Sequence, residues 1–255
     1  MSLVLRMLLI GAVVAYLGAC LWLFIVQRSL IYYPPPALSS DDGATTIILP
    51  THAARVLVST RPKDGPGAVI YFGGNSENVS VSMPIFISAF PDRAIYLLHY
   101  RGYGGSSGSP SEKALFADAM LLFDEVRAQH PNIDLVGRSL GSGVAVYVAS
   151  QRPVARLVLV TPYDSIQELA ALQIPYLPVT WLLRDKFESW RYAPRVTAPT
   201  LIIAAEHDEI IPRANSELLR SRFKSGLASF KVIGGASHNS ISDSPEYVQL
   251  LKGSQ

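Results

Sequence analysis

The stretch 134-DLVGRSLGSG-143 decides the fold, because it places Ser139 between two glycines where one sequence pattern changes to another. An apolar run typical of a buried strand precedes the serine, and small residues that favour a helix follow from Leu140 to Ser150. A serine in such a strained strand-to-helix turn projects its hydroxyl from the edge of a sheet. A side chain at Gly137 or Gly141 would collide there with the neighbouring strand or helix. We therefore interpret Ser139 as a nucleophile; the alternative is a glycine-rich turn with an incidental serine.

The rest of the chain alternates short apolar runs with helical patterns, after an expected antiparallel pair at 45–52 and 55–61. This alternation predicts an α/β fold, in which a mostly parallel sheet carries helices on both faces, over residues 45–255. Further strands are expected at 68–74, 94–100, 132–137, 156–162, 200–208 and 228–235, and helices at 111–130, 140–150, 212–223 and 244–253.

Residues 163–195 interrupt the alternation with a very apolar segment that contains three prolines and two tryptophans. The segment follows a strand at the edge where ligand crevices form in such sheets. We expect a cap-like insertion over the site; ordinary packing of an inserted helix is the alternative. The substrate-binding residues are otherwise unknown, and the candidates within the insertion are Ile174, Tyr176, Leu177 and Trp181.

A serine hydroxyl becomes a good nucleophile only when a base removes its proton. In folds with this turn, the acid and then the histidine follow the serine along the chain. Only His207 and His238 follow Ser139, and His238 lies in the loop GGASHNSIS after the last expected strand. We therefore predict His238 as the base, although a lone loop histidine is often only a solvated surface residue.

The predicted acid is Asp208, which ends the strand TLIIAAEHD and precedes a turn. Its carboxylate would accept the Nδ1 proton of the histidine and so hold the required tautomer. Asp164 follows the preceding strand and is the main alternative, and Glu206 and Glu209 are the others.

The tetrahedral intermediate of acyl transfer needs two backbone N–H donors, which form an oxyanion hole. Leu140, directly after the nucleophile, is expected to supply one, and the loop after AVIYFGG the other. We predict the amide of Asn75 for this second role, with Gly74 next. Asn75 or Ser76 would also serve as the cap of a following helix, and the two roles are compatible.

No charged residue occurs from Met7 to Val26, which is long enough to cross the hydrocarbon core of a bilayer. We expect an uncleaved membrane anchor helix over residues 1–33 and a linker at 34–44. One alternative is a lipoprotein, because 17-LGAC-20 resembles a cleavage box in which Cys20 carries the lipid. The others are a cleaved signal peptide and a buried core helix.

The orientation of this anchor is weakly determined, because Arg6 precedes the apolar run and Arg28 follows it. We expect the short N-terminus inside and the domain on the outer, periplasmic or lumenal, face. The net charge is only +2 and the basic residues are scattered, so no nucleic-acid partner is expected. The spacing of the histidines, the single cysteine and the missing phosphate-binding fingerprints also predict no metal and no cofactor.

The motifs YFGGNSEN, HYRGYGGSSGSPSE, LVGRSLGSGVAV, LLRDKFESW, HDEIIP and GGASHNS occur in this order. By these motifs, the chain from about Leu30 to Tyr247 resembles the membrane-anchored α/β-hydrolases that include the fungal bud-emergence-type proteins and the animal protein depalmitoylases. The resemblance implies the α/β-hydrolase fold, a triad of Ser139, Asp208 and His238, and an N-terminal membrane segment. The family usually has His-Gly-Asn after the third strand, where this chain has Gly73; this departure implies a more mobile loop and leaves the triad in place.

These features predict a membrane-anchored serine hydrolase that cleaves carboxylic esters or thioesters of acyl chains, as lipases, esterases and depalmitoylases do. Its substrate would be a lipid or an acylated protein, and the best-understood members of the resembled family cleave acyl chains from cysteine thioesters. Two alternatives stay open. One is a non-catalytic binding or scaffolding module with this fold, and the other is a peptidase or amidase with the same triad.

Overall fold

An eight-stranded sheet forms the centre of the computed structural model, which describes residues 2–36, 45–51 and 54–253. Most of the expected linker at 34–44 therefore lies outside the described residues. The strands are β1 (Thr45–Leu49), β2 (Val56–Arg61), β3 (Gly67–Phe72), β4 (Ala94–Leu98), β5 (Asn132–Arg138), β6 (Arg156–Val160), β7 (Thr200–His207) and β8 (Ala228–Ser237). Their order across the sheet is β1-β2-β4-β3-β5-β6-β7-β8.

The sheet is antiparallel only at one edge, where β1 pairs with β2 and β2 pairs with β4. All the other neighbours are parallel. The central strands β3, β5 and β6 are buried along nearly their whole length, as continuous apolar runs predict for strands covered on both faces. The predicted mostly parallel sheet is thus confirmed, and its parallel strands bring their carboxyl ends to one edge.

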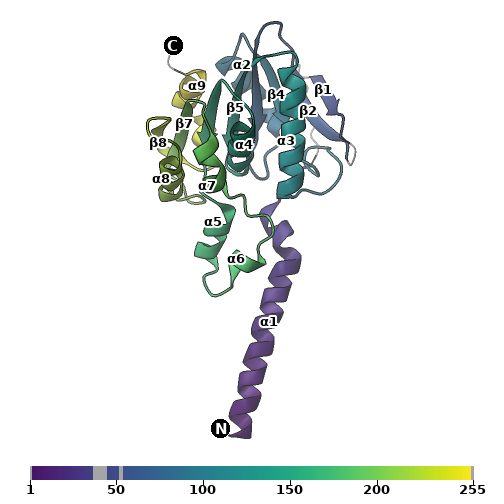
Figure 1. Ribbon diagram of the computed structural model, residues 1–255, viewed down its shortest axis with the longest axis vertical. Helices are drawn as coiled ribbons and strands as arrows, with labels where there is room; N and C mark the ends of the chain where they lie inside the picture. The colour runs from purple at the N-terminus through teal and green to yellow at the C-terminus, as the bar shows by residue number, and fades with distance from the viewer. Residues whose placement is uncertain (1, 37–44, 52–53, 254–255) are drawn as a thin grey trace.

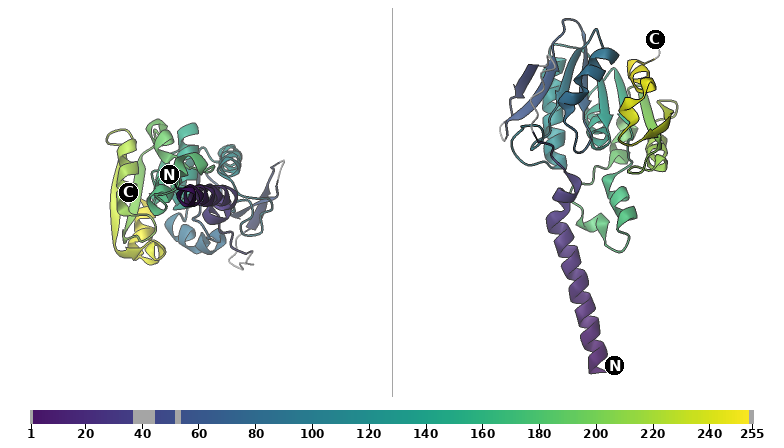
Figure 2. Two further views of the ribbon diagram at one scale, coloured as in Figure 1. Left: turned by 90° about the horizontal axis from the view of Figure 1, so that it is seen from below. Right: turned by 180° about the vertical axis from the view of Figure 1, so that it is seen from behind.

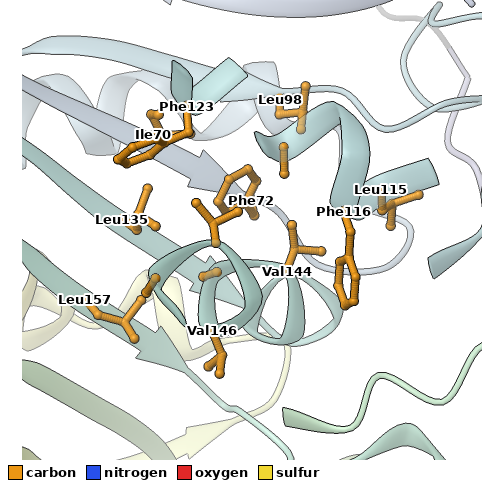
Figure 3. Packing of buried hydrophobic residues seen from close by; sticks show 14 of the residues in the cluster. Ile70, Phe72, Leu98, Leu115, Phe116, Phe123, Leu135, Val144, Val146 and Leu157 are labelled. Atoms are coloured by element: carbon orange, nitrogen blue, oxygen red, sulfur yellow. The ribbon is translucent and has the colours of Figure 1, made fainter. Parts of the chain in front are cut away.

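Helices cover both faces of the sheet (Figure 1). On one face lie α3 (Glu112–Arg127), α4 (Leu140–Gln151) and α8 (Arg213–Arg222), and on the other lie α2 (Met83–Ala89) and α9 (Pro245–Lys252). Figure 3 shows the larger core, in which Phe116 of α3 and Val144 of α4 pack with Phe72 of the sheet. The predicted cap of α3 is also confirmed, because the Ser111 hydroxyl accepts a hydrogen bond from the N–H of Ala114 at 3.2 Å.

The expected insertion lies between β6 and β7. It contains three short helices, α5 (Ile166–Gln173), α6 (Val179–Leu182) and α7 (Ser189–Tyr192), followed by the 3₁₀ helix η2 (Ala193–Arg195). The other 3₁₀ helices among the described residues are η1 (Val79–Ser82) and η3 (Ile241–Asp243). Because α5 and α6 extend below the sheet in Figure 1, the insertion covers the edge where the parallel strands end.

The first helix, α1 (Leu3–Ile31), extends away from the domain in Figure 1 and in both views of Figure 2. Its 29 residues correspond to about 43 Å at a rise of 1.5 Å per residue. Among the described residues, it is the one helix that is long and apolar enough to cross a membrane. Only Leu23 and Gln27 of this helix are buried, so the core-helix alternative is wrong. The helix is a candidate membrane anchor.

Candidate active site

Ser139 forms the sharp turn between β5 and α4. Its φ of 48° and ψ of −117° lie outside the regions that non-glycine residues normally adopt. Two close approaches keep the turn in place. A Cβ at Gly137 would lie 2.5 Å from the carbonyl oxygen of Gly141, and a Cβ at Gly141 would overlap the backbone of Phe72 in β3. The prediction that both glycines prevent backbone collisions is therefore confirmed.

His238 comes directly after β8, and its imidazole lies between the serine and a carboxylate. Its Nε2 is 3.1 Å from Ser139 Oγ, and its Nδ1 is 2.9 Å from each carboxylate oxygen of Asp208. A proton on Nδ1 faces the carboxylate and leaves the lone pair of Nε2 for the serine hydroxyl. The structure therefore brings the three predicted residues into the order that proton transfer requires.

Asp208 follows β7 and is held in place by the backbone of the next turn. Its Oδ1 accepts hydrogen bonds from the N–H groups of Ile210 at 3.0 Å and Ile211 at 2.7 Å. Its side chain and that of His238 are only 3% and 6% exposed. The carboxylate is thus kept dry and correctly aimed at the imidazole.

The three alternative acids all have other partners. Asp164 pairs with Arg222 at 3.2 Å, and Glu206 accepts the N–H of Gly235 at 2.7 Å. Glu209 lies near His238 but accepts its backbone N–H, at 3.3 Å, and not its ring N–H. Asp208 is therefore the carboxylate that contacts the imidazole.

The loop after β3 lies beside the nucleophile. A Cβ atom added to Gly74 in this loop would lie only 3.6 Å from the Cβ of Ser139. The amide of Gly74, our second choice of oxyanion donor, donates instead to Glu77 Oε2 at 2.7 Å, so this prediction is corrected. Among the described residues, the N–H groups of Leu140 and Asn75 have no acceptor. Both remain free to bind a substrate oxygen.

The expectation that Asn75 or Ser76 caps a helix was wrong, because η1 is capped by the side chain of Asn78. The Asn75 side chain instead connects the loop to the end of α1. Its Nδ2 donates to the carbonyl of Ile31 at 2.7 Å, and its Oδ1 accepts the N–H of Tyr33 at 2.9 Å. The loop that carries the candidate donor is therefore held by the candidate anchor.

Glu77 is a residue of the site that the sequence reasoning missed. Besides the amide of Gly74, its carboxylate accepts hydrogen bonds from Tyr71 Oη at 2.7 Å and Ser82 Oγ at 2.8 Å. Burial, and to a lesser extent the charge of Glu77, raise the pKa of Tyr71 well above its usual value, so that the phenol stays a donor. One sequence signal could have indicated this role. Glu77 lies three positions after Gly74 in the same loop, a spacing at which a carboxylate can accept the backbone N–H of the glycine.

An apolar cavity of about 280 Å³ reaches Ser139. Besides Ser139, Leu140 and Asn75, its walls are the insertion residues Ile166, Leu169, Ala170, Gln173, Ile174, Val179, Leu182 and Leu183, the α1 residues Leu23, Gln27, Leu30 and Ile31, and Tyr163, Ile210 and Ile211. Of the four substrate-binding candidates in the insertion, the structure places only Ile174 in this wall. Tyr176 and Trp181 are 89% and 86% exposed, and their side chains do not reach the cavity.

The other described histidines have no hydrogen bond to the side chains of the triad. His207 is exposed beside Glu206 at 3.7 Å, His130 hydrogen-bonds the carbonyl of Gly65 at 2.8 Å, and His99 is buried between two serines. Among the residues that the structure describes, no three His, Cys, Asp or Glu side chains are close enough together to hold a metal ion.

The sequence profile of the α/β-hydrolase fold matches residues 67–189. The chain also resembles the protein bem46 of Schizosaccharomyces pombe, at 29% identity over 210 residues that cover 77% of this chain and 69% of the relative. The chain has the α/β-hydrolase fold. Among the solved structures, the chain is similar to the monoacylglycerol lipase of Paleococcus ferrophilus, with a TM-score of 0.60 and 18% identity over 78% of this chain and 95% of the lipase. The predicted fold and the resemblance to bud-emergence-type proteins are thereby confirmed.

A further relative of the chain is an uncharacterized protein of Mycobacterium tuberculosis, which is 37% identical over 180 residues. The match covers 69% of this chain and 63% of the mycobacterial protein, less than two thirds of its length. These comparisons establish the α/β-hydrolase fold of the chain, and its activity follows below as a proposal from the site.

Proposed function

We propose that the protein is a membrane-anchored serine hydrolase that cleaves carboxylic esters or thioesters of acyl chains through an acyl-enzyme. The observation that carries the proposal is the chain of contacts from Asp208 through His238 to Ser139, at 2.9 Å and 3.1 Å. The apolar cavity that reaches Ser139 supports an acyl chain as the group next to the reacting carbonyl.

In the first half of the reaction, Nε2 of His238 takes the proton of the Ser139 hydroxyl while Oγ attacks the carbonyl carbon. The carbonyl oxygen becomes negatively charged and accepts hydrogen bonds from the N–H groups of Leu140 and Asn75. The bond from carbon to the leaving oxygen or sulfur then breaks, and the proton passes from His238 to the leaving group. Asp208 stabilises the imidazolium that exists between these two proton transfers.

In the second half, a water molecule gives a proton to Nε2 of His238 and attacks the carbonyl carbon of the acyl-serine. The bond to Ser139 Oγ breaks, the proton passes to Oγ, and the carboxylic acid leaves. The same N–H groups stabilise the second tetrahedral intermediate. Neither half requires a metal or an organic cofactor, because the polarisation of the carbonyl comes from backbone dipoles alone.

The apolar walls predict a preference for longer acyl chains. Each methylene that is transferred from water into an apolar site contributes about 0.8 kcal/mol, which corresponds to roughly fourfold in kcat/KM. The substrate class is therefore an acyl ester or thioester carried by a lipid or by an acylated protein. In this proposal α1 holds the protein in the bilayer, with the short N-terminus inside and the domain outside.

Labelling by a fluorophosphonate probe tests the proposal. The wild-type protein should form a covalent adduct that the Ser139→Ala variant cannot form, and Asp208→Asn should slow both labelling and ester turnover by about 10⁴-fold. A wild-type protein that does not label would favour a non-catalytic binding module. Faster turnover of peptides than of acyl esters would favour a peptidase or amidase with the same triad.

A further inference from the structure

The insertion lies along α1 well beyond the point where the domain meets this helix. Near the domain, Gln27 donates from Nε2 to the carbonyl of Leu182 at 3.1 Å and accepts the N–H of Arg184 at 2.6 Å. Farther along α1, the hydroxyl of Tyr16 donates to the carbonyl of Tyr176 at 3.3 Å. The contacts at Gln27 and at Tyr16 each join α1 to a segment more than 150 residues away in the sequence.

The distance between these two contacts follows from the helix itself. Tyr16 and Gln27 are eleven positions apart, which corresponds to about 16 Å along the axis. The hydrocarbon core of a bilayer is about 30 Å thick, so each leaflet contributes about 15 Å. If α1 spans the bilayer through its uncharged run, the insertion extends through the leaflet that adjoins the domain, and its deepest part, at Tyr176, lies near the middle of the bilayer.

The composition of the insertion agrees with this depth. Residues 169–183 contain no charged side chain, and α1 contains none from Met7 to Val26. Both uncharged stretches end at the same level, where Arg28 pairs with Asp185 at 2.9 Å and the guanidinium of Arg184 lies 4.5 Å above the ring of Phe24. Cations at this level suit the headgroup region, where arginine side chains reach phosphate and water.

We define residues 172–181 as the cap tip. Its side chains Leu172, Tyr176 and Trp181 are 63%, 89% and 86% exposed, which is unusual for large apolar groups in water. Trp181 precedes Leu182, whose carbonyl binds Gln27 near the headgroup level, and an indole ring favours the boundary between headgroups and acyl chains. In Figure 1 and in the right-hand view of Figure 2, this part of the insertion lies beside α1, on the side from which the helix leaves the domain.

The backbone of the cap tip also exposes few polar groups, and unpaired N–H and C=O groups are costly in lipid. Pro175 and Pro178 have no N–H. The N–H groups of Ile174, Leu177 and Val179 donate to nearby carbonyls at 2.8 to 3.2 Å. The carbonyl of Tyr176 accepts a hydrogen bond from the hydroxyl of Tyr16, so the polar groups of this bend pair with one another and with α1.

The cavity to Ser139 lies between the same two elements. Its α1 wall consists of Leu23, Gln27, Leu30 and Ile31, which recur at helical spacing on one face, and its opposite wall comes from α5 and α6. Leu21 and Ile25 lie on other faces of α1, are 60% and 69% exposed, and do not line the cavity. One face of the candidate anchor therefore belongs to the cavity, and the rest faces outward.

We propose that the cap tip inserts into the membrane leaflet beside α1, and that the acyl chain of the substrate passes from this leaflet into the cavity between them. The inference rests on the proposed function and deepens it. The partner surface is a lipid leaflet, the substrate is an acyl chain that already lies in it, and Leu23 of the anchor is a residue that determines chain length.

Fluorescence quenching tests the insertion without any catalytic activity. The full chain with Ser139→Ala is reconstituted into phosphatidylcholine vesicles that contain bromine-labelled acyl chains, in three variants that keep only Trp22, Trp181 or Trp190, the others being changed to phenylalanine. The brominated lipid should reduce the emission of Trp22 and Trp181 by at least half, whereas Trp190, on α7, should be quenched by aqueous iodide. A Trp181 emission that responds like that of Trp190 would overturn the insertion.

Chain-length selectivity tests the path of the acyl chain. Leu23→Trp fills the α1 wall of the cavity, and Ile25→Trp makes the same change on an outward face of the same helix. For each variant, kcat/KM is measured with a vesicle-bound palmitoyl ester and with a water-soluble butyryl ester, and the palmitoyl value is divided by the butyryl value. Leu23→Trp should lower this ratio at least tenfold, and Ile25→Trp should lower it less than twofold. Equal effects would overturn the proposed path. If the wild type turned over neither ester, the proposed function would be contradicted. The insertion of the cap tip would still be decided by the quenching experiment, which needs no catalytic activity.

Discussion

Arg28, in the last turn of α1, donates from its Nε to the carboxylate of Asp185 in the insertion at 2.9 Å. The hydroxyl of Tyr32 donates to the same carboxylate at 3.2 Å, and the Asp185 side chain is only 5% exposed. This ion pair fastens the candidate anchor to the insertion beside the cavity that leads to Ser139. The anchor is thus connected to the site on two sides, since Asn75 binds its final carbonyl.

The first prediction concerns this ion pair. Arg28→Ala should lower the free energy of unfolding by about 3 kcal/mol, because it leaves a buried carboxylate without its cation. Arg152 and Asp124 form a matched but exposed pair at 2.8 Å, and Arg152→Ala should cost less than about 1 kcal/mol. Denaturant titration of both variants in the same detergent measures the difference. Equal costs would mean that Asp185 is hydrated and that its pairing adds little.

The second prediction concerns the turn at the nucleophile. Gly141→Ala should destabilise the protein by about 3 kcal/mol or more and abolish probe labelling, because the added methyl overlaps the backbone of Phe72. Gly234→Ala is the control, since a Cβ there would lie 3.7 Å from Glu206 Oε2, an ordinary contact. Thermal unfolding and labelling rates follow the two variants. Normal labelling of Gly141→Ala would show that the turn can move to make room.

The third prediction assigns Glu77 a positioning role for the oxyanion loop. Glu77→Ala leaves the amide of Gly74 and the hydroxyls of Tyr71 and Ser82 without their acceptor, so the loop should lose its orientation. We expect kcat for an acyl ester to fall about 10- to 100-fold with little change in KM, since loss of one oxyanion donor costs about that much or more. Glu77→Gln keeps an acceptor and should recover part of the rate. A rise in KM at constant kcat would instead indicate a substrate-binding role.

The fourth prediction concerns acid stability. His99 is 5% exposed, its Nε2 lies 2.8 Å from Ser59 Oγ, and burial lowers the pKa of this imidazole from 6.5 to about 4. Between these values the unfolded chain binds a proton that the folded protein does not, so stability is complete above pH 6.5 and is lost as the pH falls towards 4. From pH 7 to 4.5, His99 should cost about 2 to 3 kcal/mol. The His99→Gln variant, measured by denaturant titration at both pH values, should lack this contribution; an identical pH dependence in both proteins would rule it out.

The sequence alone was sufficient for the features that arise from local patterns. Apolar runs and their spacing predicted the strands, and Ser111 predicted the start of α3, because periodicity and capping act between near neighbours. The glycines at 137 and 141 predicted the tight turn at Ser139 because they form a short pattern that is typical of a nucleophile between a strand and a helix. The choice of Asp208 and His238 followed from the chain order of nucleophile, acid and histidine in folds with this turn. Their meeting with Ser139 is consistent with the parallel sheet, since its strands place their carboxyl ends at one edge.

Other features depended on contacts between residues distant in the chain, which no local pattern encodes. Only the tertiary structure decided that Glu77 takes the amide of Gly74, which removes one candidate oxyanion donor. It likewise placed Ile174 in the cavity wall while Tyr176 and Trp181 point outward, although all three look equally apolar in the sequence.

The contrast between what the sequence determined and what the tertiary structure decided is clearest for α1. Its uncharged run and its length marked it as a candidate anchor from composition alone, because crossing a bilayer requires only about twenty apolar residues. That Leu23 and Gln27 form part of the wall near Ser139 was decided by the folded insertion, which packs against one face of the helix. Composition determines which solvent a helix prefers, whereas the shape of a neighbouring surface determines which of its faces is buried.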